Sequence, residues 1–327
     1  MVTGVLATDR GSLAFGVREL DTVAPDGRAT TWLRSDAGTW TTADLPARAG
    51  TQIQAPSRGA AGGSTVVLGG AGGTNLCAHP FGGTSWVDSG AGWQQTPATN
   101  DDCVRVPVGI AYGPAGFIEA TAATGEVYGF WVSADGLAGT YLPARTTAVG
   151  DGILDGGIAA DASRYVVVGR GTASEPRAWT SVDGRAWTSL GLVAGQGITP
   201  GVPVAGAGRF VIVAIGSQGT VGTWVVENGA RSVRSVAADA SMSGATIPAG
   251  TGTADALVLV GTLAGRPTLW RSTDGATWHA FRLDDGDAEP GAVAIEAGRI
   301  TVTGTWTDAS GATRGIAWTH AWPFAGG

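Results

Sequence analysis

Short apolar runs, separated by glycine and polar pairs, follow one another along the whole chain. The clearest set is Gly157–Asp161, Arg164–Gly169, Arg177–Ser181 and Ala186–Leu190, with Asp183-Gly184 between the last two runs. Each run has the length and composition of a short strand. An Asp-Gly pair readily supplies the positive φ that a tight hairpin bend needs. The pattern therefore predicts a unit of four short antiparallel strands.

Tryptophan marks the repetition of this unit. One tryptophan falls on the third predicted strand of each unit, and these residues are Trp32, Trp86, Trp131, Trp179, Trp224, Trp270 and Trp318. Their separations are 54, 45, 48, 45, 46 and 48 residues. Small sheets repeated with this period are typical of a β-propeller, in which neighbouring blades cover both faces of each sheet. We predict one all-β domain over 1–327, a seven-bladed β-propeller of four-stranded antiparallel blades at about 1–47, 48–98, 104–145, 152–193, 198–238, 243–284 and 290–327.

The two ends of the chain leave the closure of the ring open. Gly4–Asp9 and Ser12–Val17 align with the first and second strands of the clearest unit, so blade 1 begins with its innermost strand. Arg314–His320 reads as a third strand near the other end. No strand borrowed from the opposite terminus is recognisable. Either the last blade has three strands, or the tail Trp322-Pro323-Phe324 completes it irregularly.

Composition and charge exclude several classes of protein. Glycine accounts for 55 of the 327 residues, and all 20 basic residues are arginine, which argues against a helical protein and suggests a bacterial source with a GC-rich genome. The net charge is −7 and no basic cluster is present, which disfavours a nucleic-acid partner. No apolar run approaches the ~20 residues of a membrane span. The chain opens on strand-like sequence, so any export signal is expected to have been trimmed or never to have existed.

The turns between third and fourth strands resemble the Asp-box, or BNR, repeat of sialidase-like propellers. The matching segments are 35–40, 181–187 and 272–278, with degraded copies at 88–93, 133–136 and 227–229. The resemblance implies that the box carboxylates, Asp36, Asp183 and Asp274, build turns by accepting hydrogen bonds from backbone amides. Asp-box propellers include glycosidases, lectins, assembly factors and receptors, so the repeat indicates a fold more than a function.

Sialidase chemistry itself is not expected. In that family, the resemblance implies three arginines around a carboxylate, a tyrosine nucleophile assisted by a glutamate, and an acidic loop residue. The four tyrosines here, Tyr112, Tyr128, Tyr141 and Tyr165, all precede the last two blades, where the nucleophile would be expected. The segment Arg18-Glu19-Leu20 also lacks the Arg-Ile-Pro opening of the family.

Ligands of such propellers normally meet the face opposite the Asp-box turns, and blade 2 departs most from the repeat there. Its long second-to-third-strand loop, Gly69–Thr84, carries Cys77, His79 and Phe81, and the next connection carries Asp101, Asp102 and Cys103. Both cysteines lie in polar loops on the same predicted face. We predict a Cys77–Cys103 disulfide worth about 3–4 kcal/mol, and with it an exported protein. Two free thiols in a cytosolic protein are the alternative.

Two further departures suggest ligands. The acidic loop with Asp285, Asp287 and Glu289 is a weak Ca²⁺ candidate without EF-hand spacing, and a solvated acidic turn competes with it. Trp306, followed by Asp308, ends a second strand near the ligand face, where an indole beside a carboxylate is a common way to bind sugar. Packing between blades is the other interpretation of Trp306. No metal and no cofactor is predicted.

These features favour a binding protein. The prediction is a monomeric extracellular or cell-surface propeller with a recognition or scaffold role, which meets a glycan or protein ligand on the face opposite the Asp-box turns. Carbohydrate is the candidate ligand class. One alternative is a glycan hydrolase or lyase with a carboxylate pair, such as Asp101 or Asp102 with Asp284 or Asp285, since glycosidases need two carboxyls ~5–10 Å apart. A second alternative is a protein-assembly factor with an exposed apolar patch. The sequence identifies no catalytic residue.

Overall fold

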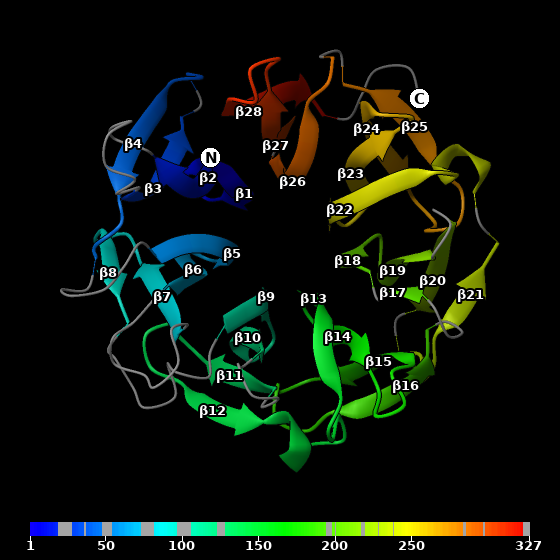
Figure 1. The fold of residues 1–327 in the computed structure, drawn as a ribbon. Helices are drawn as coiled ribbons and strands as arrows, with labels where there is room; N and C mark the ends of the chain where they lie inside the picture. Colours follow the sequence, from blue (N-terminus) through cyan, green and yellow to red (C-terminus); the bar gives the residue numbers. More distant parts are fainter. Residues whose placement is uncertain are drawn as a thin grey trace.

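The chain forms a ring of seven antiparallel sheets around a central axis, as a computed structural model shows (Figure 1). The structure describes residues 1–18, 28–35, 37–47, 54–72, 82–96, 106–122, 128–193, 198–199, 201–216, 220–227, 229–237, 239–283, 286–296 and 298–322. Each sheet comes from one continuous stretch of sequence. The predicted seven-bladed propeller is therefore confirmed.

Each blade runs from the axis to the rim in chain order. The innermost strands are β1 (Val2–Thr8), β5 (Gln54–Gly62), β9 (Val106–Gly113), β13 (Ile153–Ala160), the split pair β17 (Ile198–Thr199) and β18 (Pro203–Gly206), β22 (Ala245–Gly252) and β26 (Glu289–Glu296). The second strands are β2 (Gly11–Arg18), β6 (Thr65–Gly72), β10 (Gly116–Ala122), β14 (Tyr165–Arg170), β19 (Arg209–Gly216), β23 (Leu257–Leu263) and β27 (Arg299–Thr307).

The outer strands complete the sheets. The third strands are β3 (Arg28–Arg34), β7 (Gly82–Asp88), β11 (Gly129–Ser133), β15 (Pro176–Ser181), β20 (Val221–Glu227), β24 (Arg266–Ser272) and β28 (Thr313–Ala321). The fourth strands are β4 (Trp40–Asp44), β8 (Trp93–Gln95), β12 (Thr140–Pro143), β16 (Thr188–Leu192), β21 (Arg234–Val236) and β25 (His279–Arg282). Two single-turn 3₁₀ helices, η2 (Ala144–Thr146) and η3 (Ala240–Met242), lie in connections between blades.

The last blade differs from the other six. Within the described residues its sheet has three strands, in the order β26-β27-β28, and no strand of blade 1 joins it. Trp322 leaves β28 by donating its amide to the Gly298 carbonyl at 2.9 Å, and its indole lies beneath the Arg271 guanidinium at 5.4 Å. Of the two closures left open by the sequence, the described chain shows the three-stranded blade.

The core lies between the blades rather than within them. The third-strand tryptophans of blades 2 and 6, Trp86 and Trp270, are fully buried. Each donates its indole N–H back to the connection before its own blade, to Pro46 at 2.8 Å and to Ser241 at 3.1 Å. A buried indole needs such an acceptor, and these bonds fix the angle between neighbouring blades.

Irregularities in the inner strands define the channel. Six of the seven carry a β-bulge at a similar height, and blade 5 instead breaks between β17 and β18. The bulged backbone crosses close to the second strand, so that a Cβ at Gly169 or Gly261 would fall on the carbonyl oxygen of Ile153 or Thr246. Only glycine fits at those two places without a backbone shift.

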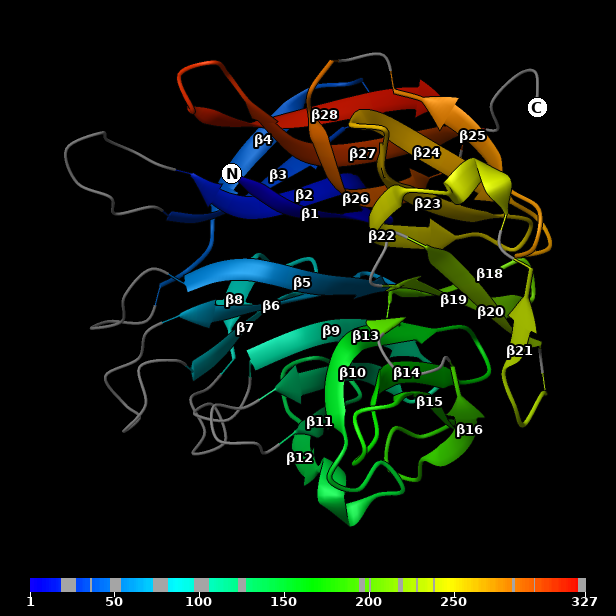
Figure 2. The same cartoon turned by 45° about the vertical axis from the view of Figure 1, so that its right-hand side comes forward.

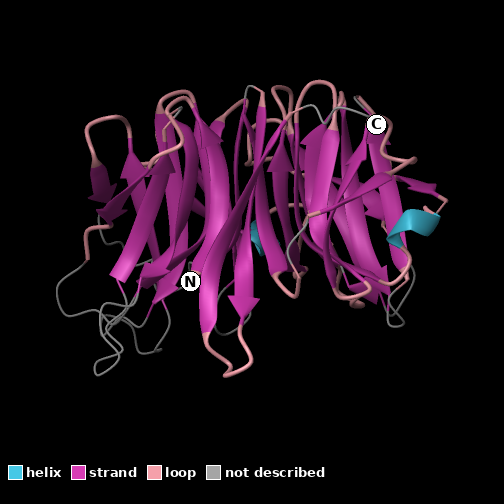
Figure 3. Cartoon of the chain, turned by 90° about the horizontal axis from the view of Figure 1, so that it is seen from above, coloured by secondary structure: helices cyan, strands magenta, loops and turns pink. Residues whose placement is uncertain are grey.

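The loops divide between two faces of the ring (Figure 3). One face carries the first-to-second-strand turns and the third-to-fourth-strand turns, including Ser181–Trp187 and Ser272–Trp278. The other carries the second-to-third-strand loops and the connections between blades, and we call it the connection face. Within the described residues, no helix has the length and hydropathy needed to cross a membrane.

Candidate functional site

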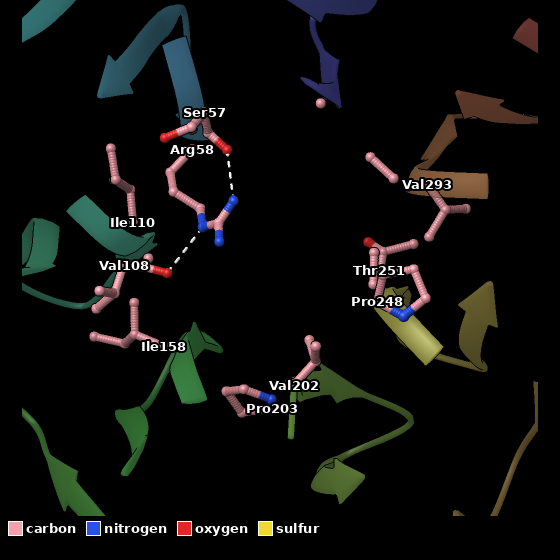
Figure 4. Close-up of a pocket in the computed structure, with 18 of the residues that line it drawn as sticks. Ser57, Arg58, Val108, Ile110, Ile158, Val202, Pro203, Pro248, Thr251 and Val293 are labelled. Carbon is pink, nitrogen blue, oxygen red and sulfur yellow. Dashed lines mark hydrogen bonds between the residues drawn. The ribbon is translucent and has the colours of Figure 1, made fainter. Parts of the chain in front are cut away.

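The central channel is lined by residues from all seven blades and combines apolar side chains with charged ones. It encloses about 420 Å³ between the seven inner strands. Its wall is mostly apolar side chains and exposed backbone, with Val108, Ile110, Ile158, Pro248 and Val293 prominent around it (Figure 4). The bulges of six inner strands and the break between β17 and β18 in blade 5 turn residues toward the axis, which produces this wall.

Arg58 is the side chain that stands out against this wall. It comes from the bulge of β5, and its guanidinium extends into the channel (Figure 4). Nε donates to the Val108 carbonyl at 2.9 Å and Nη1 donates to the Ser57 carbonyl at 2.8 Å. These two bonds leave donors of the planar fork directed at the channel. Confinement between the strands lowers the pKa of Arg58 because the charged form loses water, yet an arginine remains protonated.

Arg58 has no carboxylate partner in the described part of the chain. The other charge at the channel, Asp155 of β13, is already paired with Arg170 of β14, whose Nε lies 2.8 Å from Oδ2. Burial raises the pKa of Asp155, and Arg170 opposes that rise only in part. The channel thus holds one neutralised pair and one uncompensated cation. Chemically, it fits an anionic group next to apolar side chains.

The predicted turn-building carboxylates Asp183 and Asp274 do not face this channel. Asp183 Oδ1 accepts from the amides of Arg185 and Ala186, both at 2.8 Å, and Asp274 Oδ1 accepts from the amides of Ala276 and Thr277, both at 2.8 Å. Both carboxylates therefore serve their own turns, on the face opposite the connection face. The third box residue, Asp36, lies outside the described residues.

Trp306 and Asp308 lie together in the β27–β28 hairpin, on the connection face (Figure 2). The Trp306 side chain is 36% exposed, and the Arg314 guanidinium covers its ring at 5.9 Å. Asp308 Oδ1 accepts from the amides of Ser310 at 2.8 Å and Ala312 at 3.0 Å and from the Ser310 hydroxyl. The Ser310 hydroxyl and the Ala312 amide lower the pKa of Asp308. The Asp308 carboxylate thus stabilises the hairpin, and the Arg314 guanidinium covers part of the Trp306 ring.

The remaining predicted residues fall largely outside the described chain. These are Cys77, His79, Phe81, Asp101, Asp102, Cys103, Asp284 and Asp285. The disulfide and the loop carboxylates therefore stay predictions. Asp287 is exposed and Glu289 begins β26, and within the described residues no group of three or more His, Cys, Asp or Glu is placed to hold a metal ion.

The comparisons with known proteins identify a fold and no family. No family model and no curated protein matches the chain. Among solved structures, YCF48 bound to D1 peptide matches with a TM-score of 0.58 at 15% identity, over 93% of this chain and 90% of that one. The β-propeller domain of the Trilobed protease from Pyrococcus furiosus, described as having an open velcro topology, matches with a TM-score of 0.60 at 8% identity, over 98% and 96%.

A sialidase is among the structural neighbours. Trypanosoma rangeli sialidase in complex with the inhibitor DANA gives a TM-score of 0.53 at 11% identity, over 98% of this chain. The chain spans about half of that enzyme, 54%. At such identities the likeness concerns the fold alone, which is compatible with a sialidase-like propeller. The assignment of the turns to the Asp-box repeat remains a prediction.

Sequence reasoning missed Arg58. It looked for ligands in the loops of the connection face, whereas this arginine lies inside a strand. A signal was present: an arginine in the innermost strand of a predicted blade faces either a neighbouring blade or the axis, and burial between blades is costly for an unpaired charge. The sequence alone does not predict the bulge that turns Arg58 toward the axis, because the bulge is defined by how β5 pairs with β6.

Proposed function

We propose that the chain is a recognition propeller that holds an extended polypeptide segment through a carboxylate at the central channel. The observation that carries the proposal is Arg58, a cation that extends into the channel and has no carboxylate partner in the described chain. A carboxylate would accept a charge-assisted hydrogen bond from the free donors of the fork and offset the lost hydration of the guanidinium. The role in this view is scaffolding, at the cell surface or outside the cell.

The channel wall favours a peptide over a sugar. Aliphatic side chains and proline predominate in it, and exposed strand backbone offers donors and acceptors to another backbone. Sugar sites usually present an exposed aromatic platform, and the exposed indole on the connection face, Trp306, is already partly covered by Arg314. A propeller of similar length whose structure is bound to a peptide, YCF48, supports this class of ligand.

A pool of synthetic decapeptides with free carboxyl termini tests the proposal. The immobilised protein should retain peptides rich in Asp, Glu or a terminal carboxylate, and their amidated, acid-free counterparts should pass through. Arg58→Ala should weaken retention about tenfold or more, because the charge-assisted hydrogen bonds of the guanidinium fork are lost. Arg58→Lys should recover part of it, since the charge stays and the fork is lost.

Arg231→Ala is the matched control, because Arg231 is an exposed arginine on the rim side of blade 5. Equal retention by wild type and Arg58→Ala would refute the site. Parallel incubation with polysaccharides covers the glycan interpretation: retention of a polysaccharide in place of peptides would overturn the peptide proposal. New glycan fragments in the mass spectrum would favour a hydrolase or lyase.

A further inference from the structure

The outer edge of blade 7 carries a second inference, separate from the channel. We propose that the open edge of β28 and the apolar groove between blades 7 and 1 bind an extended segment of a partner polypeptide. The segment would form the fourth strand of blade 7. It would contain an acidic residue followed directly by a large apolar residue. Figure 1 shows β28, in red, at the rim beside the blue strands of blade 1. The partner is therefore recognised by β-strand addition.

The exposure of β28 distinguishes it from the other third strands. Six of its nine residues are exposed, whereas every residue of β11 is buried and β24 has one exposed residue. In the described chain, β28 pairs along its whole length with β27 and with no strand on its other side. No strand of the described chain bonds to its outward N–H and C=O groups, and such unpaired groups are what an added strand requires.

An apolar groove lies directly beside this ladder. It encloses about 330 Å³ between Val2, Trp32 and Trp40 of blade 1 and Ile316 and Ala317 of blade 7. Trp32 is the third-strand tryptophan of blade 1 and is only partly buried, while the equivalent Trp86 and Trp270 are fully buried. The groove is thus the place where a tryptophan lacks the cover that it has elsewhere in the ring.

Blades 1, 4 and 6 show what supplies that cover. In these blades the residue directly after the fourth strand donates its amide to the carbonyl three positions before the third-strand tryptophan. The pairs are Leu45 to Ala29 at 2.8 Å, Val193 to Pro176 at 2.9 Å and Leu283 to Pro267 at 3.0 Å. The same residue inserts its side chain between blades, as Leu45 does in the cluster with Trp86. The equivalent carbonyl in blade 7 belongs to Gly315, which lines the groove.

Charge complementarity adds the acidic position. In blade 1, Arg28 lies four residues before Trp32 and pairs with Asp44 of the fourth strand at 3.4 Å, one residue before Leu45. Arg314 stands at the same distance before Trp318. It is exposed, and in the described chain no carboxylate lies within salt-bridge distance of it. An acidic residue on the added strand would meet Arg314, and the apolar residue after it would enter the groove against Trp32.

The sequence of β4 supplies the probe. A labelled peptide, Trp-Thr-Thr-Ala-Asp-Leu, copies residues 40–45 and should bind the protein, as measured by fluorescence anisotropy. Replacing its Leu by Asp should abolish binding. Arg314→Glu should weaken binding roughly tenfold, and a peptide with Lys in place of Asp should restore it to that variant. Ala317→Pro, which removes an outward N–H, should also weaken binding while the thermal midpoint shows a folded ring.

Two controls keep this site distinct from others. Arg266→Glu changes the arginine four residues before Trp270, where a fourth strand is present, and should leave peptide affinity unchanged. Arg58→Ala should also leave it unchanged, because the channel is a separate site. A third variant adds Thr-Ala-Asp-Leu after Gly327. The added residues then have the same spacing from Trp318 that Thr42–Leu45 have from Trp32. This variant should no longer bind the peptide and should be more stable to heat, because its own chain would occupy the edge.

Three results would overturn the inference. The first is no binding of the wild-type peptide above its Leu→Asp counterpart. The second is binding that Arg314→Glu and Ala317→Pro leave intact. The third is a wild-type dimer in sedimentation velocity that Ala317→Pro dissociates, since the occupant would then be a second copy of this chain.

Discussion

The protonation state of single carboxylates in the turns affects the free energy of unfolding. Partial burial tends to raise the pKa of Asp274, but the amides of Thr277 and Ala276 and the Ser272 hydroxyl outweigh it, and the pKa falls to about 2. A depressed pKa means that the ionised form is stabilised by folding. This contribution is present in full above the ordinary aspartate pKa of 3.8 and is lost as the pH falls toward about 2.

We therefore expect Asp274→Ala to lower the free energy of unfolding at pH 7 by roughly 1–2 kcal/mol, allowing for solvent screening of a partly exposed group. Denaturant titrations between pH 7 and pH 3 check this. The difference from wild type should shrink across the acid end of that range. Asp287→Ala, at an exposed position, should change stability by less than about 0.5 kcal/mol. A constant difference at all pH values would show that the turn is held by something other than the carboxylate.

Some glycines in the second strands lie so close to a bulged inner strand that a side chain would not fit there. Gly261→Ala places a methyl group on the backbone carbonyl of Thr246, so β22 or β23 has to move. We expect a loss of about 1–3 kcal/mol, measured by urea denaturation. Gly291→Ala is the control, because its new methyl would meet only the Thr303 oxygen, at 3.9 Å. Equal losses in the two variants would refute the close-approach argument.

At the scale of strands, the free edge of β28 should be visible in hydrogen exchange. The amides of Ala317 and Thr319 point to the open side, and those of Leu269 and Arg271 in β24 occupy the same register but face β25. We expect the first two to exchange at least tenfold faster than the second two, because no backbone acceptor in the described residues protects them. Equal protection would show that the edge is already covered in solution.

The strands themselves could be predicted from the sequence, and the channel could not. Runs such as Arg164–Gly169 and the repeated third-strand tryptophans are local signals, and the structure places strands at Tyr165–Arg170 and at each of those tryptophans. Arg58 depends on a bulge, which is a property of pairing between two strands rather than of either run. Asp308 is a similar case, because its carboxylate accepts hydrogen bonds from amides of its own hairpin. Those bonds depend on the conformation of residues 308–312, which composition alone does not specify.

For the whole ring, closure depends on side chains at the junction of blades 7 and 1. Ser12 is fully buried, shares a hydrogen bond with Thr301 at 2.8 Å and donates to Glu296. Ser12→Ala should lower the free energy of unfolding by about 1–3 kcal/mol, because two polar groups of blade 7 lose a buried partner. Ser163→Ala removes a hydroxyl bonded to Asp161 in an exposed turn and should have little effect. Equal effects in thermal denaturation would place the closure elsewhere.

A ring in which each sheet uses one uninterrupted stretch of chain has a consequence for how such molecules change over time. Duplicating or deleting the segment for one blade leaves every other sheet with all of its own strands. A propeller that shares a strand between its termini lacks this freedom, since its first and last segments must be kept as a matched pair. Gain and loss of whole blades is therefore open to this architecture, within the limits set by the packing between neighbouring blades and by the contacts that close the ring.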